Sequence, residues 1–201
     1  MAVGKYMLFI ATAFFIQVQP KVILFFGDSL TAGYGLSPEE AFPALAGKAL
    51  TKNGKNVNIV NAGLSGETSA GGLTRIDWVL RQPVDVFVLE LGANDGLRGL
   101  PVDETKKNLQ GIIDKVKAKN PNVKIVVTGM MVPPNMGAAY TTQFTAIFPE
   151  IAKKNNATLM PFLLEGVAGN EKLNQADGIH PNIEGHKIVA ANITKILSPL
   201  L

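Results

Sequence analysis

Five short apolar runs, each separated from the next by a helical pattern, constrain the fold of this chain more than any other feature. The runs are rich in Val, Ile, Leu and Phe and lie at 22–26, 57–60, 84–89, 123–128 and, more weakly, 157–160. Several show no alternation of apolar and polar residues, which is typical of strands covered on both faces. Repeated strand–helix alternation predicts an α/β domain with a parallel sheet and helices on both faces.

The segments between the runs repeat apolar residues at helical spacing. The clearest of them are 42–49, 109–116, 144–151 and 188–197. A shorter helix is expected around 70–80, although Gly71 and Gly72 weaken its start. Ser37-Pro38-Glu39-Glu40 is typical of a capping box and is expected to begin the helix that contains 42–49. Pro149 is expected to kink or split the helix over 144–151.

Composition bounds the function classes. The 201 residues suit one domain, and the low charged fraction of 17% with a net charge of +3 excludes intrinsic disorder. The lysines are spread singly or in pairs along the expected helices, which argues against a long nucleic-acid-binding surface. Because the chain has no Cys, disulfides, zinc thiolates and a Cys nucleophile are excluded.

The N-terminus reads differently from the rest. Residues 6–16 are apolar, Lys5 precedes them, and the next charge is Lys21. Eleven residues are too few to span a bilayer, but the pattern suits a signal peptide or short membrane tether. The only Ala-x-Ala cleavage pattern, at 11–13, would cut the run in half, so a buried or added extension is the alternative. We assign 1–20 to this segment and 21–201 to the domain, and expect a periplasmic or secreted protein, with a cytoplasmic one as the alternative.

A candidate nucleophile follows the first expected strand. The strand ends in Gly27-Asp28-Ser29-Leu30, and open parallel sheets bind ligands at the carboxyl ends of their strands. Ser29 is a poor nucleophile without a base, and in isolation such a tetrapeptide is more often an ordinary turn. Asp28 adjoins Ser29 and is expected to point elsewhere and cap nearby N–H groups.

The candidate base is one of only two His residues. His180 lies in Asp177-Gly178-Ile179-His180-Pro181, before the last expected helix. A carboxylate three residues before the imidazole can hold its tautomer and stabilise the imidazolium, as a Ser-His-Asp triad requires. The alternative for His180 is a turn residue packed by Pro181. Asn182 is expected to cap the helix, and His186 is expected on that helix's surface.

Two further strand ends carry groups that can bind a developing oxyanion. Gly63 lies in Asn61–Thr68 and allows a close backbone approach, while Asn94 follows the third strand and offers a side-chain amide. With the N–H of Ser29 these make three donors. Each segment alone could be a turn, because Asn and Gly favour turns for local reasons.

Together these segments resemble a known family. GDSLTAGYG, NAGLSGET, LGANDG and DGIHP match, in order and spacing, the four blocks of the SGNH hydrolases, the GDSL-type esterases and lipases. The resemblance covers about 22–197. The stretch from GDSLTAGYGL through ELGANDGLRGLP resembles the bacterial branch of arylesterases, acyl-thioesterases and lysophospholipases.

The resemblance implies both a fold and residue roles. The fold is a flavodoxin-like three-layer α/β/α sandwich with a five-stranded parallel sheet in the order 2-1-3-4-5. By position, Ser29 matches the nucleophile, Asp177 and His180 match the acid and base, and Gly63 and Asn94 match oxyanion donors. Neither a metal nor a cofactor is implied.

We therefore predict a serine esterase that hydrolyses small carboxylic esters with aryl or short to medium acyl groups. Its expected substrates include thioesters or lysophospholipids. No nucleic acid or protein partner is implied. A carbohydrate O-acetylesterase is the alternative, although one Trp and three Tyr offer few sugar platforms, and 130–139 and 162–168 are rich in Met, Pro, Leu and Phe. A non-catalytic flavodoxin-like binding protein is more remote, because phosphate-binding glycine motifs are missing and Asp28 repels phosphate.

Two features have open interpretations. Glu90 ends an apolar strand and is expected to be buried and paired with Arg75 or Arg98, or else to reach solvent.

The segment 96–101 contains two glycines and two leucines. It is either a hinged lid over an acyl chain or a fixed connection into the next helix.

Overall fold

The computed structural model describes residues 19–201 and contains one parallel sheet of five strands. The order is β2-β1-β3-β4-β5, as the family resemblance implied. The strands are β1 (Lys21–Gly27), β2 (Val57–Gly63), β3 (Val86–Glu90), β4 (Lys124–Thr128) and β5 (Thr158–Met160). The apolar runs therefore predicted each strand to within a few residues. The expected signal peptide or tether lies outside the described residues, apart from the exposed Gln19 and Pro20.

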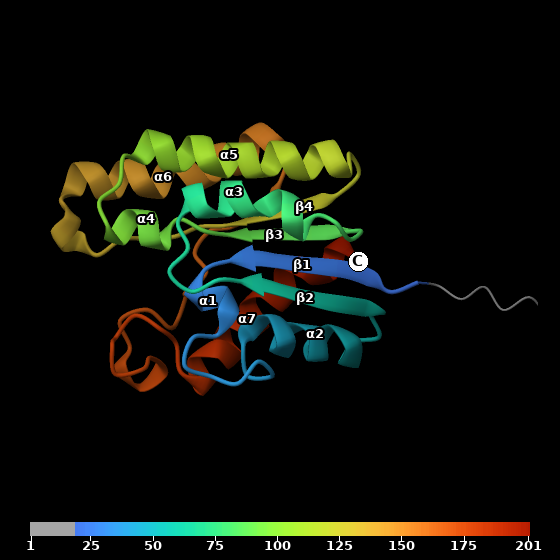
Figure 1. The fold of residues 1–201 in the computed structure, drawn as a ribbon. Helices are drawn as coiled ribbons and strands as arrows, with labels where there is room; N and C mark the ends of the chain where they lie inside the picture. The colour runs from blue at the N-terminus through green and yellow to red at the C-terminus, as the bar shows by residue number, and fades with distance from the viewer. Residues whose placement is uncertain (1–18) are drawn as a thin grey trace, which may run out of the picture.

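Helices cover both faces of the sheet, which confirms the predicted three layers. Figure 1 shows α2 and α7 on one face and α3, α5 and α6 on the other. The helices are α1 (Ser29–Ala32), α2 (Phe42–Lys52), α3 (Ser69–Val79), α4 (Ala93–Leu97), α5 (Val102–Lys119), α6 (Ala138–Asn155) and α7 (Ile183–Leu197). Short 3-10 turns occur at Pro134–Met136, Glu171–Leu173 and Ser198–Leu200. Within residues 19–201, no helix has the length and apolar character needed to cross a membrane.

The core lies on both sides of the central strands. Every residue of β3 is buried, and so are the last five of β1, whereas the edge strands β2 and β5 are mostly half-buried. Phe25 packs edge-on against Phe42 of α2 at 5.6 Å between ring centroids. The next residue, Phe26, lies under the Arg75 guanidinium of α3 at 4.4 Å. Successive side chains thus meet opposite helix layers, which explains the unbroken apolar run in this strand.

The predicted capping box does not begin α2, and Pro149 does not split α6. The Ser37 N–H and hydroxyl do bond the Glu40 carboxylate, at 3.1 and 2.7 Å, but they close a separate turn. Helix α2 begins only at Phe42, whose N–H donates to His186 Nδ1 at 3.0 Å. Helix α6 continues through Pro149 as one element. Its buried apolar face runs through both halves of the helix, and this packing outweighs the local cost of proline.

His186 lies in the core, and the prediction that it lies on the helix surface was wrong. Its side chain is buried between α7 and α2, where Nδ1 accepts the Phe42 N–H and the ring stacks on the Phe42 ring. Burial lowers the pKa of His186 from 6.5 to about 4. The imidazole is therefore neutral at physiological pH and joins α7 to the start of α2.

The buried His186 predicts a loss of stability in acid. In the unfolded chain this group takes up its proton near pH 6.5, and in the folded protein only near pH 4, so the free energy of unfolding falls as pH drops through that window. A shift of this size corresponds to about 3 kcal/mol. We expect His186→Asn, whose amide oxygen can accept the Phe42 N–H, to flatten this dependence. Urea unfolding of both proteins from neutral pH down to about pH 4 measures it. Parallel pH dependences would contradict the assignment.

Candidate active site

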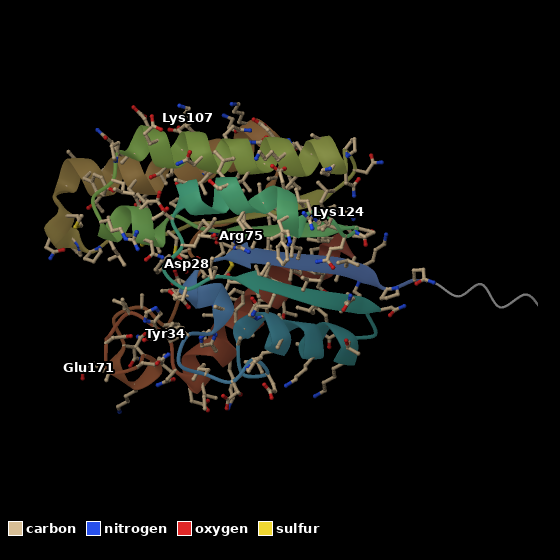
Figure 2. All side chains as sticks on the ribbon, in the orientation of Figure 1. Asp28, Tyr34, Arg75, Lys107, Lys124 and Glu171 are labelled. Atoms are coloured by element: carbon tan, nitrogen blue, oxygen red, sulfur yellow. The ribbon has the colours of Figure 1, made fainter. Side chains whose placement is uncertain are left out.

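The polar residues singled out in the sequence meet at the carboxyl ends of the strands. Ser29 is the first residue of α1, immediately after β1, and Asp28 caps that helix by accepting the Leu30 N–H at 3.0 Å, as predicted. Figure 2 shows Asp28 at this end of the sheet and Lys124 at the opposite end. Only Gly fits at position 27, because a Cβ there would collide with Thr31 and the Glu90 carboxyl group. The sharp turn that presents Ser29 therefore depends on close packing beneath it.

Ser29, His180 and Asp177 form a hydrogen-bonded series. Ser29 Oγ lies 2.9 Å from His180 Nε2, and His180 Nδ1 lies 2.7 Å from Asp177 Oδ2. The other oxygen of Asp177 accepts the N–H groups of Ile179 and His180, each at 3.0 Å. Residues 151 positions apart in the sequence are thus brought into direct contact.

The electrostatics of this series set its proton positions. The His180 N–H is the main cause that lowers the pKa of Asp177 to about 2, so the carboxylate is ionised at neutral pH. An ionised carboxylate only accepts hydrogen bonds, so the proton of a neutral His180 sits on Nδ1. The lone pair of Nε2 then faces the Ser29 hydroxyl. In this arrangement His180 can take up the hydroxyl proton.

The loop that carries His180 is anchored to the segment that follows Ser29. Gln175 donates from Nε2 to the carbonyl groups of Tyr34 and Pro181, at 2.7 and 3.0 Å, and its N–H donates to the His180 carbonyl group at 2.7 Å. The Tyr34 ring lies 4.7 Å from the imidazole. Asn182 caps α7 by accepting the Gly185 N–H, as predicted. These contacts fix the imidazole relative to α1.

Asn94 reaches the same place from the end of β3. It lies on the short helix α4, and its Nδ2 donates to Asp28 Oδ2 and to the Glu67 carbonyl group, both at 3.1 Å. Its neighbour Asp95 is buried and accepts the N–H and hydroxyl of Ser69 at 2.8 and 2.5 Å. The sequence reading missed this role of Asp95, which ties α4 to the start of α3. Asp95 thereby holds the backbone that carries Asn94.

Gly63 does not reach the site. The second strand extends three residues beyond its predicted end, so Gly63 is its last residue and packs against the backbone of α1. Its N–H donates to Asn61 Oδ1 at 3.0 Å. Gly66 lines the cavity instead, with φ +80° and an N–H that bonds no group in residues 19–201. If the second strand is predicted to end at Gly63, the next glycine in the loop that follows it is Gly66.

Neither arginine proposed for Glu90 pairs with it. Arg75 forms a two-point ion pair with Glu67, with contacts of 2.8 and 2.5 Å, and Arg98 donates to the Gly66 carbonyl group at 3.1 Å. Glu90 is fully buried, as one of the two interpretations expected, but its hydrogen-bond donors are the N–H groups of Asp28 and Thr31 and the Thr31 hydroxyl. The register of β3 against β1 directs its side chain under the Ser29 turn and away from the arginines.

The segment proposed as a lid is only partly free. Gly96 lies inside α4, where a Cβ would press on Val132 and Phe144, so packing rather than hinge motion accounts for this glycine. Leu97 is 45% exposed and lines the cavity, whereas Leu100 is half-buried and outside the cavity lining. The two leucines therefore occupy different environments.

A cavity of about 660 Å³ opens beside Ser29. Its walls are largely apolar, and Ser29, Asn94 and His180 are among the polar residues that line it. The apolar wall consists mainly of Leu30, Leu97, Met130, Met131, Val132, Pro133, Pro134, Phe162, Leu164 and Ile179. In the part of the chain that the structure describes, no three His, Asp or Glu side chains gather as metal ligands.

Comparison with known proteins places this geometry in context. Residues 25–188 match the model of the GDSL-like Lipase/Acylhydrolase family. The esterase TesA of Pseudomonas aeruginosa is 37% identical over 186 residues, covering 92% of each chain. Thioesterase 1/protease 1/lysophospholipase L1 of Escherichia coli K12 is 38% identical over 96% of this chain and 91% of its own length. The crystal structure of AlinE4, an SGNH-hydrolase family esterase, superimposes with a TM-score of 0.76 at 42% identity, covering 92% of this chain and 98% of that one.

Proposed function

Because the chain belongs to the GDSL-like lipase/acylhydrolase family, we propose that it is a serine esterase that hydrolyses carboxylic esters through Ser29. The observation that carries this proposal is the continuous hydrogen-bonded series from Ser29 Oγ through His180 to Asp177, with contacts of 2.9 and 2.7 Å. A serine hydroxyl becomes a nucleophile when a held base faces it, and this series supplies that base.

The reaction proceeds in two halves. Ser29 Oγ attacks the ester carbonyl carbon while its proton passes to His180 Nε2, and the ionised Asp177 stabilises the imidazolium. The tetrahedral intermediate collapses to an acyl-serine, and His180 protonates the departing alcohol or thiol. His180 then takes a proton from water, which attacks the acyl group and releases the acid and free Ser29.

Three donors surround the position of the developing oxyanion in this proposal. They are the N–H groups of Ser29 and Gly66 and the Asn94 side-chain amide, with Gly66 in place of the Gly63 expected from the sequence. The N–H groups of Ser29 and Gly66 make no hydrogen bond to other groups of residues 19–201. Asn94 shares its amide between Asp28 and the neutral Glu67 carbonyl group. An oxyanion is a stronger acceptor than a neutral carbonyl, so it can draw one of these hydrogens away from Glu67.

The cavity favours acyl or aryl groups over sugars. Its apolar wall can bury an acyl chain, and the names of the relatives describe an esterase and a thioesterase/lysophospholipase. Trp78 is exposed on α3 and is not among the residues that line the cavity. We therefore propose esters and thioesters with aryl or medium acyl groups as substrates.

Ser29→Ala tests the nucleophile. We expect hydrolysis of a nitrophenyl ester to fall by at least about 10⁴-fold with the unfolding midpoint unchanged, because the acyl-enzyme cannot form. Mass spectrometry after treatment with a fluorophosphonate should place the label on Ser29. Ser65→Ala is the matched control, because Ser65 lines the same cavity without a base, and the label should stay at Ser29 there. A fully active Ser29→Ala protein labelled elsewhere would remove the proposal.

Asn94→Ala tests the oxyanion site. Loss of one positioned donor should cost about 3–4 kcal/mol of transition-state stabilisation. The loss should appear in kcat and not in KM, because the donor acts most strongly where charge develops. Steady-state kinetics on one soluble ester separates the two parameters. A raised KM with unchanged kcat would identify Asn94 as a group that binds the substrate's ground state.

Leu97→Ala tests the acyl-chain site, with Leu100→Ala as the control outside the cavity. If Leu97 covers an acyl chain, its truncation should remove about 1–2 kcal/mol of transition-state stabilisation for an octanoyl ester. That loss lowers kcat/KM for this ester about tenfold, whereas kcat/KM for an acetyl ester should be nearly unchanged. Leu100→Ala should change both substrates equally. Equal losses on both esters for Leu97→Ala would show that this segment does not sense the acyl chain.

A further inference from the structure

Glu90 is a buried acid that the reaction scheme does not use. It ends β3, pairs in register with Gly27, and is fully buried. Its Oε2 accepts three hydrogen bonds from the Ser29 turn: the Asp28 N–H at 3.1 Å, and the Thr31 N–H and hydroxyl at 3.2 and 2.7 Å. Its other oxygen, Oε1, is buried without a hydrogen-bond donor anywhere in residues 19–201. Glu90 therefore holds the first turn of α1 with one oxygen and leaves the other unused.

The charged groups around Glu90 do not neutralise it. Glu90 faces the carboxyl group of Asp28, which is the N-cap of α1, and the Thr31 hydroxyl of α1. From β4 the nearest polar side chain is Thr128, which donates to the Leu89 carbonyl group. Arg75 pairs with Glu67 and not with Glu90. The charge of His180 interacts with Asp28. Two ionised carboxylates packed together without a cation would be strongly unfavourable, so this pair keeps one proton.

We propose that Glu90 is held as a neutral carboxylic acid whose O–H donates to the Asp28 carboxylate, which makes Glu90 a positioning residue for both Ser29 and Asn94. This inference rests on the proposed esterase function. Protonation gives Oε1 a hydrogen to donate, and Asp28, whose N–H already contacts Oε2, supplies the carboxylate acceptor. Asp28 in turn caps Leu30 and holds the Asn94 amide, so one proton fixes the nucleophile turn and an oxyanion donor together.

The direction of the acid–base equilibria agrees with this geometry. Burial, followed by the charge of Asp28, raises the pKa of Glu90 well above its ordinary value. Burial also raises the pKa of Asp28, to about 6, while its hydrogen bonds to the Leu30 N–H and the Asn94 amide oppose the shift. At neutral pH Asp28 is therefore ionised and Glu90 carries the proton.

Loss of this proton in alkaline solution would place two negative charges under the Ser29 turn. Repulsion would then disturb the Asn94 contact and lower kcat. Stability follows the same proton: the unfolded chain loses it near pH 4.5, whereas the folded protein keeps it to higher pH. The free energy of unfolding therefore decreases as pH rises above 4.5, relative to a variant without this acid.

Glu90→Gln and Glu90→Met separate a positioning role from simple packing. The amide of Gln can accept the α1 donors and donate to Asp28, as the neutral acid does, whereas Met fills similar space without hydrogen bonds. We expect Met to lower kcat by about 100-fold with KM little changed, and Gln to restore most of that loss. The wild-type kcat should fall on the alkaline side of neutrality, and the Gln variant should lack that fall. The stability of the Gln variant relative to wild type should instead rise from pH 4.5 upward, through the range in which the folded protein keeps a proton that the unfolded chain has lost.

Infrared difference spectroscopy detects the proton without relying on catalysis. The C=O stretching band of a protonated carboxylic acid should be present in the full-length protein at neutral pH and absent in Glu90→Gln. Glu67→Gln is the matched control, because Glu67 is also buried but forms an ion pair with Arg75. The band should persist in that variant. If Glu90→Met does not fold, the band and the pH profile of Glu90→Gln still decide the proposal.

The outcomes distinguish failure of this inference from failure of the proposed function. A band that persists in Glu90→Gln, or a folded Gln variant as inactive as the Met variant, would overturn the neutral-acid assignment. An alkaline fall in kcat that is identical in wild type and Glu90→Gln would also overturn it. An active Ser29→Ala protein would instead overturn the esterase mechanism, and the infrared result for Glu90 would stand independently.

Discussion

The pairing of Gly27 with Glu90 across the two central strands is the contact on which the rest of the site depends. It places a fully buried carboxyl group directly beneath the turn that carries Ser29, where three donors of Asp28 and Thr31 converge on one oxygen. Gly27 permits this approach because any side chain there would occupy the same space. Hydrogen bonds from the Ser29 turn to Glu90 therefore fix the turn to the end of β3, which belongs to the close-packed core.

Hydrogen bonds to backbone groups position the remaining site residues. Two N–H groups of its own loop hold Asp177, and the Glu67 carbonyl group holds Asn94. Gln175 ties the His180 loop to the Tyr34 segment. Such contacts fix side-chain direction before a substrate arrives, which is the requirement for stabilising a charge that exists only in the transition state. The wall of the cavity beside these groups is largely apolar.

Much of this arrangement could be predicted from the sequence because the signals are local. Apolar runs without alternation identified the strands, and helical spacing identified the long helices. The Asp177–His180 spacing of three residues predicted a contact within one loop, and the structure has it at 2.7 Å. Ser29 and Asn94 were found because parallel strands place their carboxyl ends at one edge of the sheet. Periodicity, turn chemistry and sheet direction indicated these positions, and the resemblance of the four motifs to the SGNH hydrolases assigned their roles.

Other features were decided by tertiary packing. His186 has the pattern of a surface residue on its helix, but contact with the start of α2 buries it. Glu90 lacks the arginine partner that its sequence neighbourhood suggested, because strand register directs it under α1. A second strand three residues longer than its pattern places Gly66, and not Gly63, beside the cavity. The sequence by itself determined the order of strands and helices along the chain and the residues able to react. Which polar group is buried, and against which partner, was decided only by the fold, because those contacts join segments far apart in the chain.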